Sequence, residues 1–423
     1  MESTIAKPLT LNCGLQLKNR LVKAALVECM ADESNLPTDL HTNLYRQWAE
    51  GGWGMVLTGS VSIDRMYLTD ARDNSYYPSN TTAFIARWRA LTDACTTSSP
   101  GNTTALIMQI NHPGRQSPLC AGSRSFTTKN IAPSPVPLNL GSGLVARFAS
   151  SLAFGTPREM TKTDIEDVIQ RHVHAARLAR EAGFHGVQLH AAHGYLFTQF
   201  LGSGTNRRTA DAYGGSVENR ARIVVETVRG IRDALGDEFC VGIKLNSVDH
   251  QSGEALAECL VQLKMIIAAG VDFVEISGGT YEDPAMMQSA SQPPTENSKS
   301  ARTLAREAFF LEFARAIRHE IPDTPLMVTG GFRSRAGVVA AIAESGCDLV
   351  GIGRPSVLRP SLPNDIILNR EVGDEQAVFP TKPVEAPWVV RIAQMPAVGS
   401  GIESRWYSGQ MQQRARRAVD AAA

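Results

Sequence analysis

Eight short runs of apolar residues recur along the chain of 423 residues, and a polar turn and a helix-like stretch follow each one. Within each run the apolar residues are nearly continuous, as in parallel strands that are covered on both faces. Eight strands that alternate with helices are typical of a closed barrel, so the pattern predicts an α/β chain folded as a single (β/α)8 TIM barrel. The runs span residues 21–26, 54–60, 105–111, 186–191, 240–246, 273–279, 326–331 and 349–354.

The segments between the runs show helical spacing and helix-start signals. Thr161 is followed three positions later by Asp164, a spacing close to that of a capping box, and Ser216 opens a second amphipathic segment. Four ranges are therefore predicted to be helices: 161–182, 216–235, 300–319 and 334–345.

Two polar stretches interrupt the alternation after the third and the sixth run. Both follow the carboxyl ends of strands, where barrel enzymes build their active sites, so we expect them to be loops that cover a substrate. The predicted organisation is a barrel over residues 1–360, with insertions at about 118–160 and 281–299, and a C-terminal extension over 361–423. We expect this extension to pack on the barrel or on a neighbouring subunit.

Composition and charge exclude several classes of protein. The 42 Lys and Arg residues equal the 42 Asp and Glu residues without a dense basic block, which argues against nucleic acid as a partner. No stretch approaches about 18 apolar residues and no signal-peptide core opens the sequence, so we expect a cytoplasmic protein without membrane association. The 7 cysteines are scattered and form no C-x-x-C pair, so we expect free thiols and no metal site.

The segment HAAHGYLFTQFL places His190, His193 and Tyr195 at the carboxyl end of the fourth predicted strand. At this spacing the imidazole N–H groups can hold and polarise a carbonyl oxygen while the phenol delivers a proton. A zinc site is a rival interpretation, but no third ligand lies near in the sequence. A structural role, in which both histidines hydrogen-bond to the loop backbone, also stays open.

Other polar residues and glycines mark the ends of further strands. Gln109 lies near the end of the third run, and its amide suits a two-pronged contact with a heteroaromatic ring. Lys244 lies inside an apolar run, so it needs either a carboxylate or an anionic ligand, and the sequence does not decide between them. Glycines after the last two strands commonly cradle a phosphate, to which Arg354 would add a bidentate cation.

Seven motifs in this order resemble those of the Old Yellow Enzyme family of FMN-dependent ene-reductases, over about residues 9–363. They are LKNRLVKAAL, QINHPGRQ, HAAHGYLFTQFL, NRRTADAYGGSVENR, VGIKLN, VTGGFRSR and VGIGRP. The HxxHGY segment followed by YGGSxENR is highly specific. The resemblance implies FMN as bound cofactor, NAD(P)H as hydride donor, and an enone or related activated alkene as substrate.

The resemblance also implies roles for the ring side chains. His190 and His193 match the pair that binds the carbonyl oxygen of the enone, and Tyr195 matches the tyrosine that protonates Cα while reduced flavin N5 gives hydride to Cβ. Cys29 is expected to contact the substrate. Larger relatives carry a cysteine cluster for an iron–sulfur centre, and no cysteine follows Cys347 here, so FMN alone is expected.

For the cofactor, Ala24, Ala25, Leu26 and Val27 match the loop against the dimethylbenzene and N5 side of the flavin, and Gly59 matches a short residue under the ring. Gln109, Lys244 and the glycines with Arg354 at the last two strand ends also match cofactor-binding positions of the family.

Gln109 matches a contact to the pyrimidine edge of the flavin. Lys244 stands where relatives usually carry arginine near flavin N1 and O2, where a cation stabilises the anionic reduced flavin. Gly331, Gly353 and Arg354 match the phosphate cradle.

The leading hypothesis is an ene-reductase with ping-pong kinetics. The same flavin site can instead serve redox-neutral isomerisation, oxidase or dehydrogenase chemistry in a biosynthetic pathway. A third class is a flavin-bearing binding protein without turnover, against which the intact His190, His193 and Tyr195 argue. Relatives with the short KAA-type first strand often form dimers, so a homodimer is one expectation.

Val27 stands where many relatives have a Thr or Cys that donates a hydrogen bond to the flavin, and valine cannot donate one. We therefore expect a shifted flavin potential. A Val27→Thr variant should move the midpoint potential by roughly 20 mV, the equivalent of one hydrogen bond of about 1 kcal/mol in a two-electron couple. A potentiometric titration in which the variant and the wild type coincide would contradict this expectation.

Overall fold

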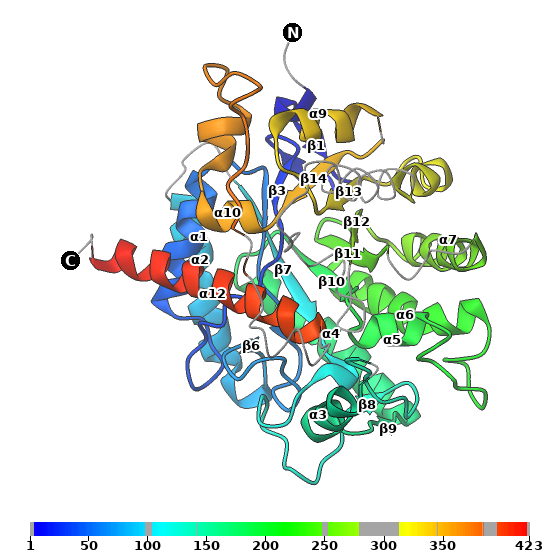
Figure 1. Cartoon of the computed structure of the whole chain (residues 1–423). Helices are drawn as coiled ribbons and strands as arrows, with labels where there is room; N and C mark the ends of the chain where they lie inside the picture. The colour runs from blue at the N-terminus through cyan, green and yellow to red at the C-terminus, as the bar shows by residue number, and fades with distance from the viewer. Residues whose placement is uncertain are drawn as a thin grey trace.

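The eight predicted strands close into a parallel barrel in the computed structural model of the chain (Figure 1). The structure describes residues 4–97, 104–141, 143–247, 253–278, 313–344, 346–382, 384 and 396–420. The barrel is closed because β10 pairs with both β7 and β11, and β14 pairs with β3. Each strand lies within one predicted run, so the (β/α)8 barrel is confirmed. The strands are β3 (Leu21–Lys23), β4 (Met55–Leu57), β7 (Ala105–Asn111), β10 (Gly186–Ala191), β11 (Cys240–Asn246), β12 (Phe273–Ser277), β13 (Leu326–Thr329) and β14 (Leu349–Ile352).

Helices cover the outside of the barrel, and three of them confirm predicted ranges. Helix α4 begins with a capping box, since Thr161 Oγ1 accepts the Asp164 N–H and the Asp164 carboxylate accepts the Thr161 N–H. Of the predicted helix 300–319, residues 313–319 are helical, and the rest lies outside the described residues. The helices are α1 (Asp39–Glu50), α2 (Thr81–Thr97), α4 (Lys162–Glu181), α5 (Leu196–Leu201), α6 (Val217–Leu235), α7 (Gly253–Ala268), α9 (Arg335–Glu344), α10 (Arg354–Leu358) and α12 (Pro396–Asp420).

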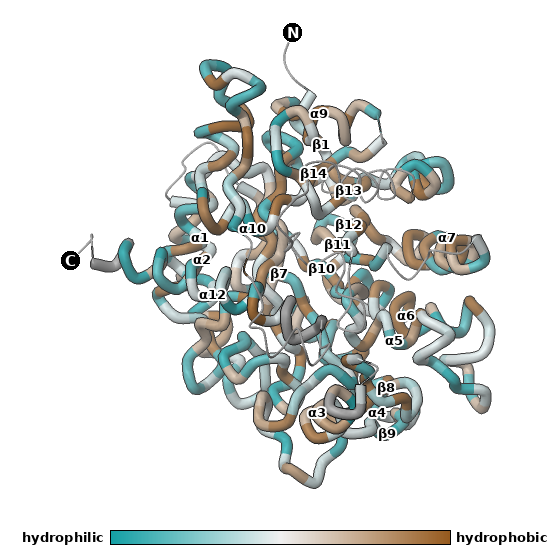
Figure 2. The backbone as a smooth tube through the Cα atoms, in the orientation of Figure 1, coloured by the Kyte–Doolittle hydropathy of each residue, from teal (hydrophilic) through white to brown (hydrophobic). Residues whose placement is uncertain are grey.

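Apolar side chains fill the amino-terminal half of the barrel. A hairpin of β1 (Leu9–Thr10) and β2 (Gln16–Leu17) closes this end, and Leu11 and Leu17 pack against the inward-facing residues of the strands. The Phe273 ring occupies the space beside Gly242, where an added Cβ would lie 2.2 Å from Phe273 Cζ, so only glycine fits. Figure 2 shows hydrophobic residues gathered in the central strands and polar residues in the outer loops.

The first predicted insertion contains regular structure in addition to loop. Within 118–160 the chain forms β8 (Ile131–Ala132), α3 (Leu144–Phe154) and β9 (Arg158–Glu159), and β8 pairs with β9. The second insertion, 281–299, lies outside the described residues. The remaining short elements are β5 (Val61–Ser62), β6 (Asn74–Ser75), η1 (Thr4–Ala6), η2 (Pro78–Asn80), η3 (Gly114–Gln116) and η6 (Pro363–Ile367).

The C-terminal helix α12 lies against α1 and α10 of its own chain (Figure 1). Its Arg414 donates to the carbonyl oxygens of Val357 (3.1 Å) and Leu358 (2.8 Å) at the end of α10. Cations near the last carbonyls of a helix are favourable, so these bonds fasten α12 to the barrel. None of the helices in the described part of the chain is long and apolar enough to span a membrane.

Several histidines are buried in the neutral form. Burial lowers the pKa of His41 and of His172 to about 4 and that of His112 to about 3. In the unfolded chain each histidine has a pKa of about 6.5 and binds a proton below that pH. In the folded protein the buried ring does not bind this proton until the pH is much lower. Their stabilising contribution is therefore present above pH 6.5 and is lost as the pH falls toward 4. Asp73, whose pKa burial raises to about 6, offsets part of this loss between pH 4 and 6.

We expect the melting temperature to fall as the pH is lowered from 7 to 4.5, because each such histidine costs about 1.4 kcal/mol per pH unit below 6.5. A His172→Gln variant should show a smaller pH slope, by about one proton, in thermal denaturation followed by circular dichroism. His319, whose side chain is 85% exposed, is the matched control, and His319→Gln should leave the slope unchanged. Equal slopes for all three proteins would contradict the prediction.

Candidate active site

The three predicted ring side chains lie together at the carboxyl end of β10. His190 is paired in register with Lys244 of β11. His193 adopts a left-handed backbone conformation (φ +58°) and is followed by Gly194 (φ +77°), so the chain turns sharply before Tyr195 caps α5. The His190 ring centroid lies 5.0 Å from that of His193 and 4.4 Å from that of Tyr195. The structure therefore brings the three rings to one place.

Hydrogen bonds and electrostatics set the state of the two imidazoles. The Ala192 N–H donates to His190 Nδ1 (3.2 Å), so the proton of the neutral ring is on Nε2, which is a donor. His193 Nε2 lies 3.2 Å from Ser277 Oγ. Burial holds the pKa of both histidines well below the usual value, and the charge of Lys244 lowers it further. Both rings are neutral near pH 7.

A chain of buried polar side chains crosses four neighbouring strands beside these rings. Lys244 Nζ lies 2.9 Å from Glu275 Oε1, and Gln188 donates from Nε2 to the other oxygen of Glu275 (2.7 Å). Gln109 donates to Gln188 Oε1 (2.7 Å) and accepts from the Ser60 hydroxyl (3.1 Å). The structure thus gives Lys244 the carboxylate partner that its burial requires.

The loop after β3 is held against the end of β4 by the side chain of Glu28. Its Oε1 accepts from the Tyr45 hydroxyl of α1 and from the Gly59 N–H (3.0 Å). A Cβ on Gly59 would lie 1.9 Å from Glu28 Oε2 and 2.4 Å from the Leu26 carbonyl oxygen. The close approach of this loop therefore requires glycine at position 59.

The segment from Ala24 to Val27 runs from the end of β3 toward α12. Ala24 is buried, and its N–H donates to the Ile352 carbonyl of β14 (3.1 Å), whereas residues 25–27 are half-buried. The Ser408 hydroxyl of α12 donates to the Val27 carbonyl (2.6 Å). The loop that we predict to face the flavin is therefore fixed at one end by the barrel and at the other by α12.

The predicted phosphate ligands lie after β13 and β14. Gly331 has a positive φ of 78°, and Gly353 precedes α10. Arg354 forms an ion pair with Glu403 of α12 (Nη1 to Oε1, 3.3 Å), and its guanidinium lies 5.8 Å from the centroid of the Tyr407 ring. The sequence did not reveal this partnership with α12, and the phosphate role of Arg354 stays a prediction.

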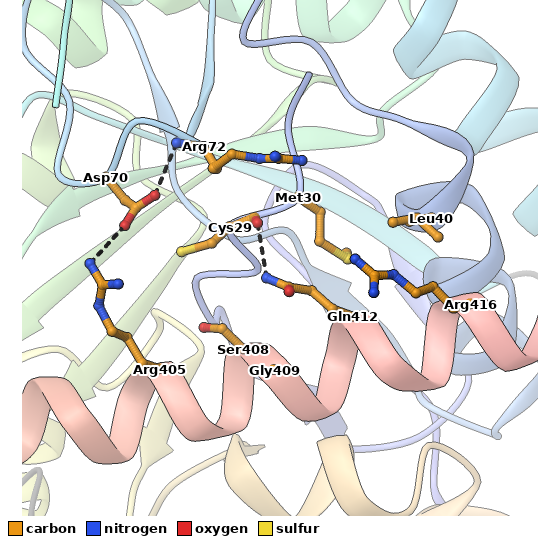
Figure 3. Close-up of a pocket in the computed structure, with 10 residues that line it drawn as sticks. All are labelled: Cys29, Met30, Leu40, Asp70, Arg72, Arg405, Ser408, Gly409, Gln412 and Arg416. Atoms are coloured by element: carbon orange, nitrogen blue, oxygen red, sulfur yellow. Dashed lines mark hydrogen bonds and ion pairs between the residues drawn. The ribbon is translucent and has the colours of Figure 1, made fainter. Parts of the chain in front are cut away.

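Cys29 lines a cavity beneath α12 (Figure 3). The residues around this cavity do not include His190, His193 or Tyr195. Burial raises the pKa of the Cys29 thiol well above its ordinary value, so the sulfur is protonated at neutral pH. A contact between Cys29 and the substrate stays a prediction.

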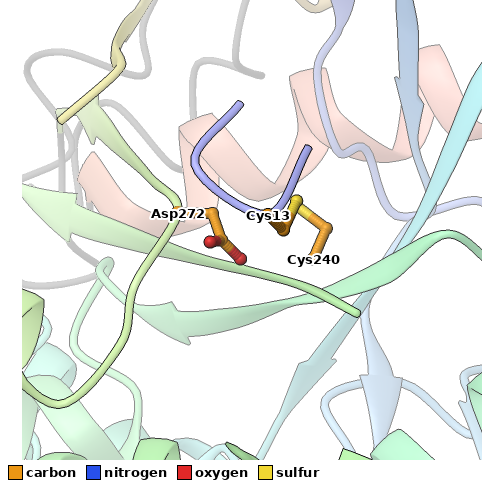
Figure 4. Close-up of side chains that lie close together, drawn as sticks. All are labelled: Cys13, Cys240 and Asp272. Atoms are coloured by element: carbon orange, nitrogen blue, oxygen red, sulfur yellow. The ribbon is translucent and has the colours of Figure 1, made fainter. Parts of the chain in front are cut away.

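A second cluster of reactive side chains lies at the opposite end of the barrel. Ligand atoms of Cys13, Cys240 and Asp272 lie within 4.8 Å of one another (Figure 4). The Asp272 carboxylate is already engaged, because it pairs with Arg232 and accepts the Val241 N–H (2.7 Å). These bonds join the start of β12 to the start of β11 and to α6, so we interpret the cluster as part of the barrel floor.

A family model described as the NADH:flavin oxidoreductase / NADH oxidase family matches residues 4–372. The chain belongs to this family. The resemblance to the Old Yellow Enzymes is thereby confirmed, and with it FMN as the bound cofactor and NAD(P)H as the reductant.

Individual relatives cover different shares of their own length. The chain is 48% identical over 409 residues to the NADH-dependent flavin oxidoreductase iliE of Neonectria, covering 95% of this chain but only 53% of the relative. It is 42% identical over 385 residues to the protein of the same name from Hypocrea jecorina, covering 91% and 94%. The solved structure of a 2-naphthoyl-CoA reductase matches with a TM-score of 0.73 at 25% identity, over 90% of this chain and 54% of that one.

The residues present at the carboxyl ends of the strands fit FMN by their chemistry. A buried amide (Gln109) and a buried ammonium (Lys244) suit the pyrimidine edge of a flavin. Thr329 Oγ1, at the end of β13, is buried without a hydrogen-bond partner among the described residues, and the exposed Gly330 and Gly331 follow it. We predict that these residues hold the cofactor.

We predict that Glu275 sets the flavin potential through Lys244. In Glu275→Gln the ammonium loses its counter-charge and stabilises the anionic reduced flavin more strongly, so the midpoint potential should rise by about 30 mV or more, equivalent to about 1.4 kcal/mol. Lys244→Gln should shift the potential in the opposite direction. Spectroelectrochemical titration measures both shifts.

The matched control is Glu258→Gln, which removes a carboxylate that pairs with Arg220 outside the site (2.6 Å). Its potential should equal that of the wild type. If the midpoint potentials of all three variants equal that of the wild type, Glu275 has no influence on the flavin potential.

Proposed function

We propose that this flavin oxidoreductase reduces the C=C bond of α,β-unsaturated carbonyl compounds, with NADH as the reductant. The observation that carries the proposal is the convergence of His190, His193 and Tyr195 at one strand end, with the His190 ring centroid 5.0 Å from that of His193 and 4.4 Å from that of Tyr195. The names of the Neonectria and Hypocrea relatives, which are called NADH-dependent, support NADH as the donor.

In this proposal the side chains of the protein bind and polarise the substrate. His190, whose Nε2 carries the proton, and His193 donate hydrogen bonds to the carbonyl oxygen and stabilise the negative charge that develops there. Because both rings are neutral, they donate without giving up a proton. The Tyr195 hydroxyl protonates Cα. When bound, reduced FMN supplies the hydride that reaches Cβ.

A Tyr195→Phe variant should reoxidise with cyclohexenone about 100-fold more slowly or worse, because a positioned general acid contributes at least that factor. Its reduction by NADH should stay within about twofold of the wild-type rate. Stopped-flow absorbance of the flavin band measures the two half-reactions separately. Tyr213→Phe is the control, because the Tyr213 hydroxyl donates to Glu226 (2.8 Å) and not into the site. Equal slowing of both half-reactions would rule out a proton-donor role.

The same experiment separates net reduction from the alternative use of the site. A redox-neutral isomerase forms product without bleaching of the flavin by NADH. In an oxidase or dehydrogenase the flavin band bleaches when the organic substrate is added without NADH. An ene-reductase bleaches with NADH and recovers with the enone.

A further inference from the structure

A cavity of about 330 Å³ lies between α12 and the loops that follow β3 and β5 (Figure 3). Cys29 lines it from the first loop, Asp70 and Arg72 from the second, and Arg405 and Arg416 from the helix. This volume is in the range of small-molecule sites in proteins. The function proposed above does not use this cavity.

The cavity carries a local excess of positive charge. Among the residues that line it, three arginines stand against one aspartate, Asp70, which gives a net charge of +2, while the carboxylates of Glu28 and Asp73 lie close enough to Cys29 to raise its pKa. The Asp70 carboxylate, at one end of the cavity, pairs with Arg405 (3.2 Å) and accepts a hydrogen bond from the backbone N–H of Arg72 (3.0 Å). Within the part of the chain that the structure describes, the guanidinium groups of Arg72 and Arg416 have no hydrogen bond or ion pair. Figure 3 shows them extending from the loop and from the helix, with Met30 between them.

Specific bonds hold the wall of the cavity in an unusual conformation. Cys29 has a φ of +52°, which non-glycine residues seldom adopt. Gln412 of α12 donates from Nε2 to the carbonyl oxygens of Cys29 (3.0 Å) and Glu28 (3.2 Å). The same helix therefore fixes the loop and supplies Arg416, so the cavity is built by α12 together with the barrel.

The cavity opens on the same end of the barrel as the candidate active site. Cys29 follows β3, and Asp70 follows β5, which pairs with the last two residues of β7. The loop from Ala24 to Val27, predicted to face the flavin, leads directly to Cys29. The cavity and the candidate active site thus lie at the same end of the barrel, and one short loop leads from the predicted flavin contacts to the wall of the cavity.

We propose that the cavity binds the diphosphate of a ligand that carries adenosine diphosphate. The two negative charges of a diphosphate ester equal the net charge of the walls, and guanidinium groups bind phosphate oxygens in pairs. NADH has such a diphosphate, and so does a coenzyme A thioester of an unsaturated acid. This proposal rests on the proposed function only where it names the compound, NADH or the coenzyme A thioester, that supplies the diphosphate.

Binding of ADP alone to the FMN-loaded protein tests the site, because ADP has no nicotinamide and takes part in no redox step. In isothermal titration calorimetry we expect Arg72→Gln with Arg416→Gln to weaken ADP binding by at least about tenfold, and the loss to shrink as salt is raised. Arg416→Lys should restore part of the affinity. The matched control is Arg417→Gln, because Arg417 neighbours Arg416 but lines a different cleft, beside Gln47 and Arg414.

Steady-state kinetics identify the source of the diphosphate. If it is NADH, the double variant raises KM for NADH at least about tenfold with kcat unchanged, and the KM for cyclohexenone does not move. If it is a coenzyme A thioester, the double variant raises KM for 2-enoyl-CoA and leaves that for NADH unchanged. Either pattern upholds the site.

Two results overturn the proposal: ADP that does not bind the wild type, or ADP affinity that is equal in the wild type and the double variant. Circular dichroism and bound-FMN absorbance show whether each variant is folded and loaded. Failure of the proposed function looks different, because an enzyme that does not reduce enones can still bind ADP through Arg72 and Arg416.

Discussion

A charge buried inside the barrel is the constraint around which the candidate site is organised. An ammonium without a partner at the position of Lys244 would cost several kcal/mol, so Glu275 must lie beside it. The second oxygen of Glu275 then needs the Gln188 amide, and Gln188 in turn fixes the orientation of Gln109. The same charge helps to keep His190 neutral. One buried cation thus determines the state of groups on four adjacent strands.

Helix α12 applies a second constraint, from outside the barrel. Its Glu403 forms an ion pair with Arg354, and its Ser408 hydroxyl donates a hydrogen bond to the Val27 carbonyl. The helix therefore contacts both the predicted phosphate end and the predicted ring end of the cofactor site. A loop that carries cofactor contacts needs support from more than its own hydrogen bonds to stay in one conformation. In this chain the C-terminal segment provides that support, and this links residues more than 300 positions apart.

The strands could be predicted because burial on both faces leaves continuous apolar runs, and the convergence of His190, His193 and Tyr195 followed from their place at a strand end. Glu275 and Gln188 carried the same signal as Lys244, a polar residue inside an apolar run, but their pairing depends on strand register, which one sequence does not reveal. The contacts of α12 could not be predicted, because they depend on how the helix packs on the barrel and no local sequence pattern indicates them. Helix α3 was missed because serine, proline and glycine around it favour a loop.

The even balance of 42 basic and 42 acidic residues conceals an uneven distribution in space. Near the carboxyl ends of the strands most cations have a carboxylate: Lys244 has Glu275, Arg354 has Glu403 and Arg405 has Asp70. Pairing of this kind lowers the net charge around these cations and holds each of them in one orientation. The cavity under α12 differs from that background, because the exposed guanidinium groups of Arg72 and Arg416 have no carboxylate partner among the described residues and are therefore available to an anion from solution.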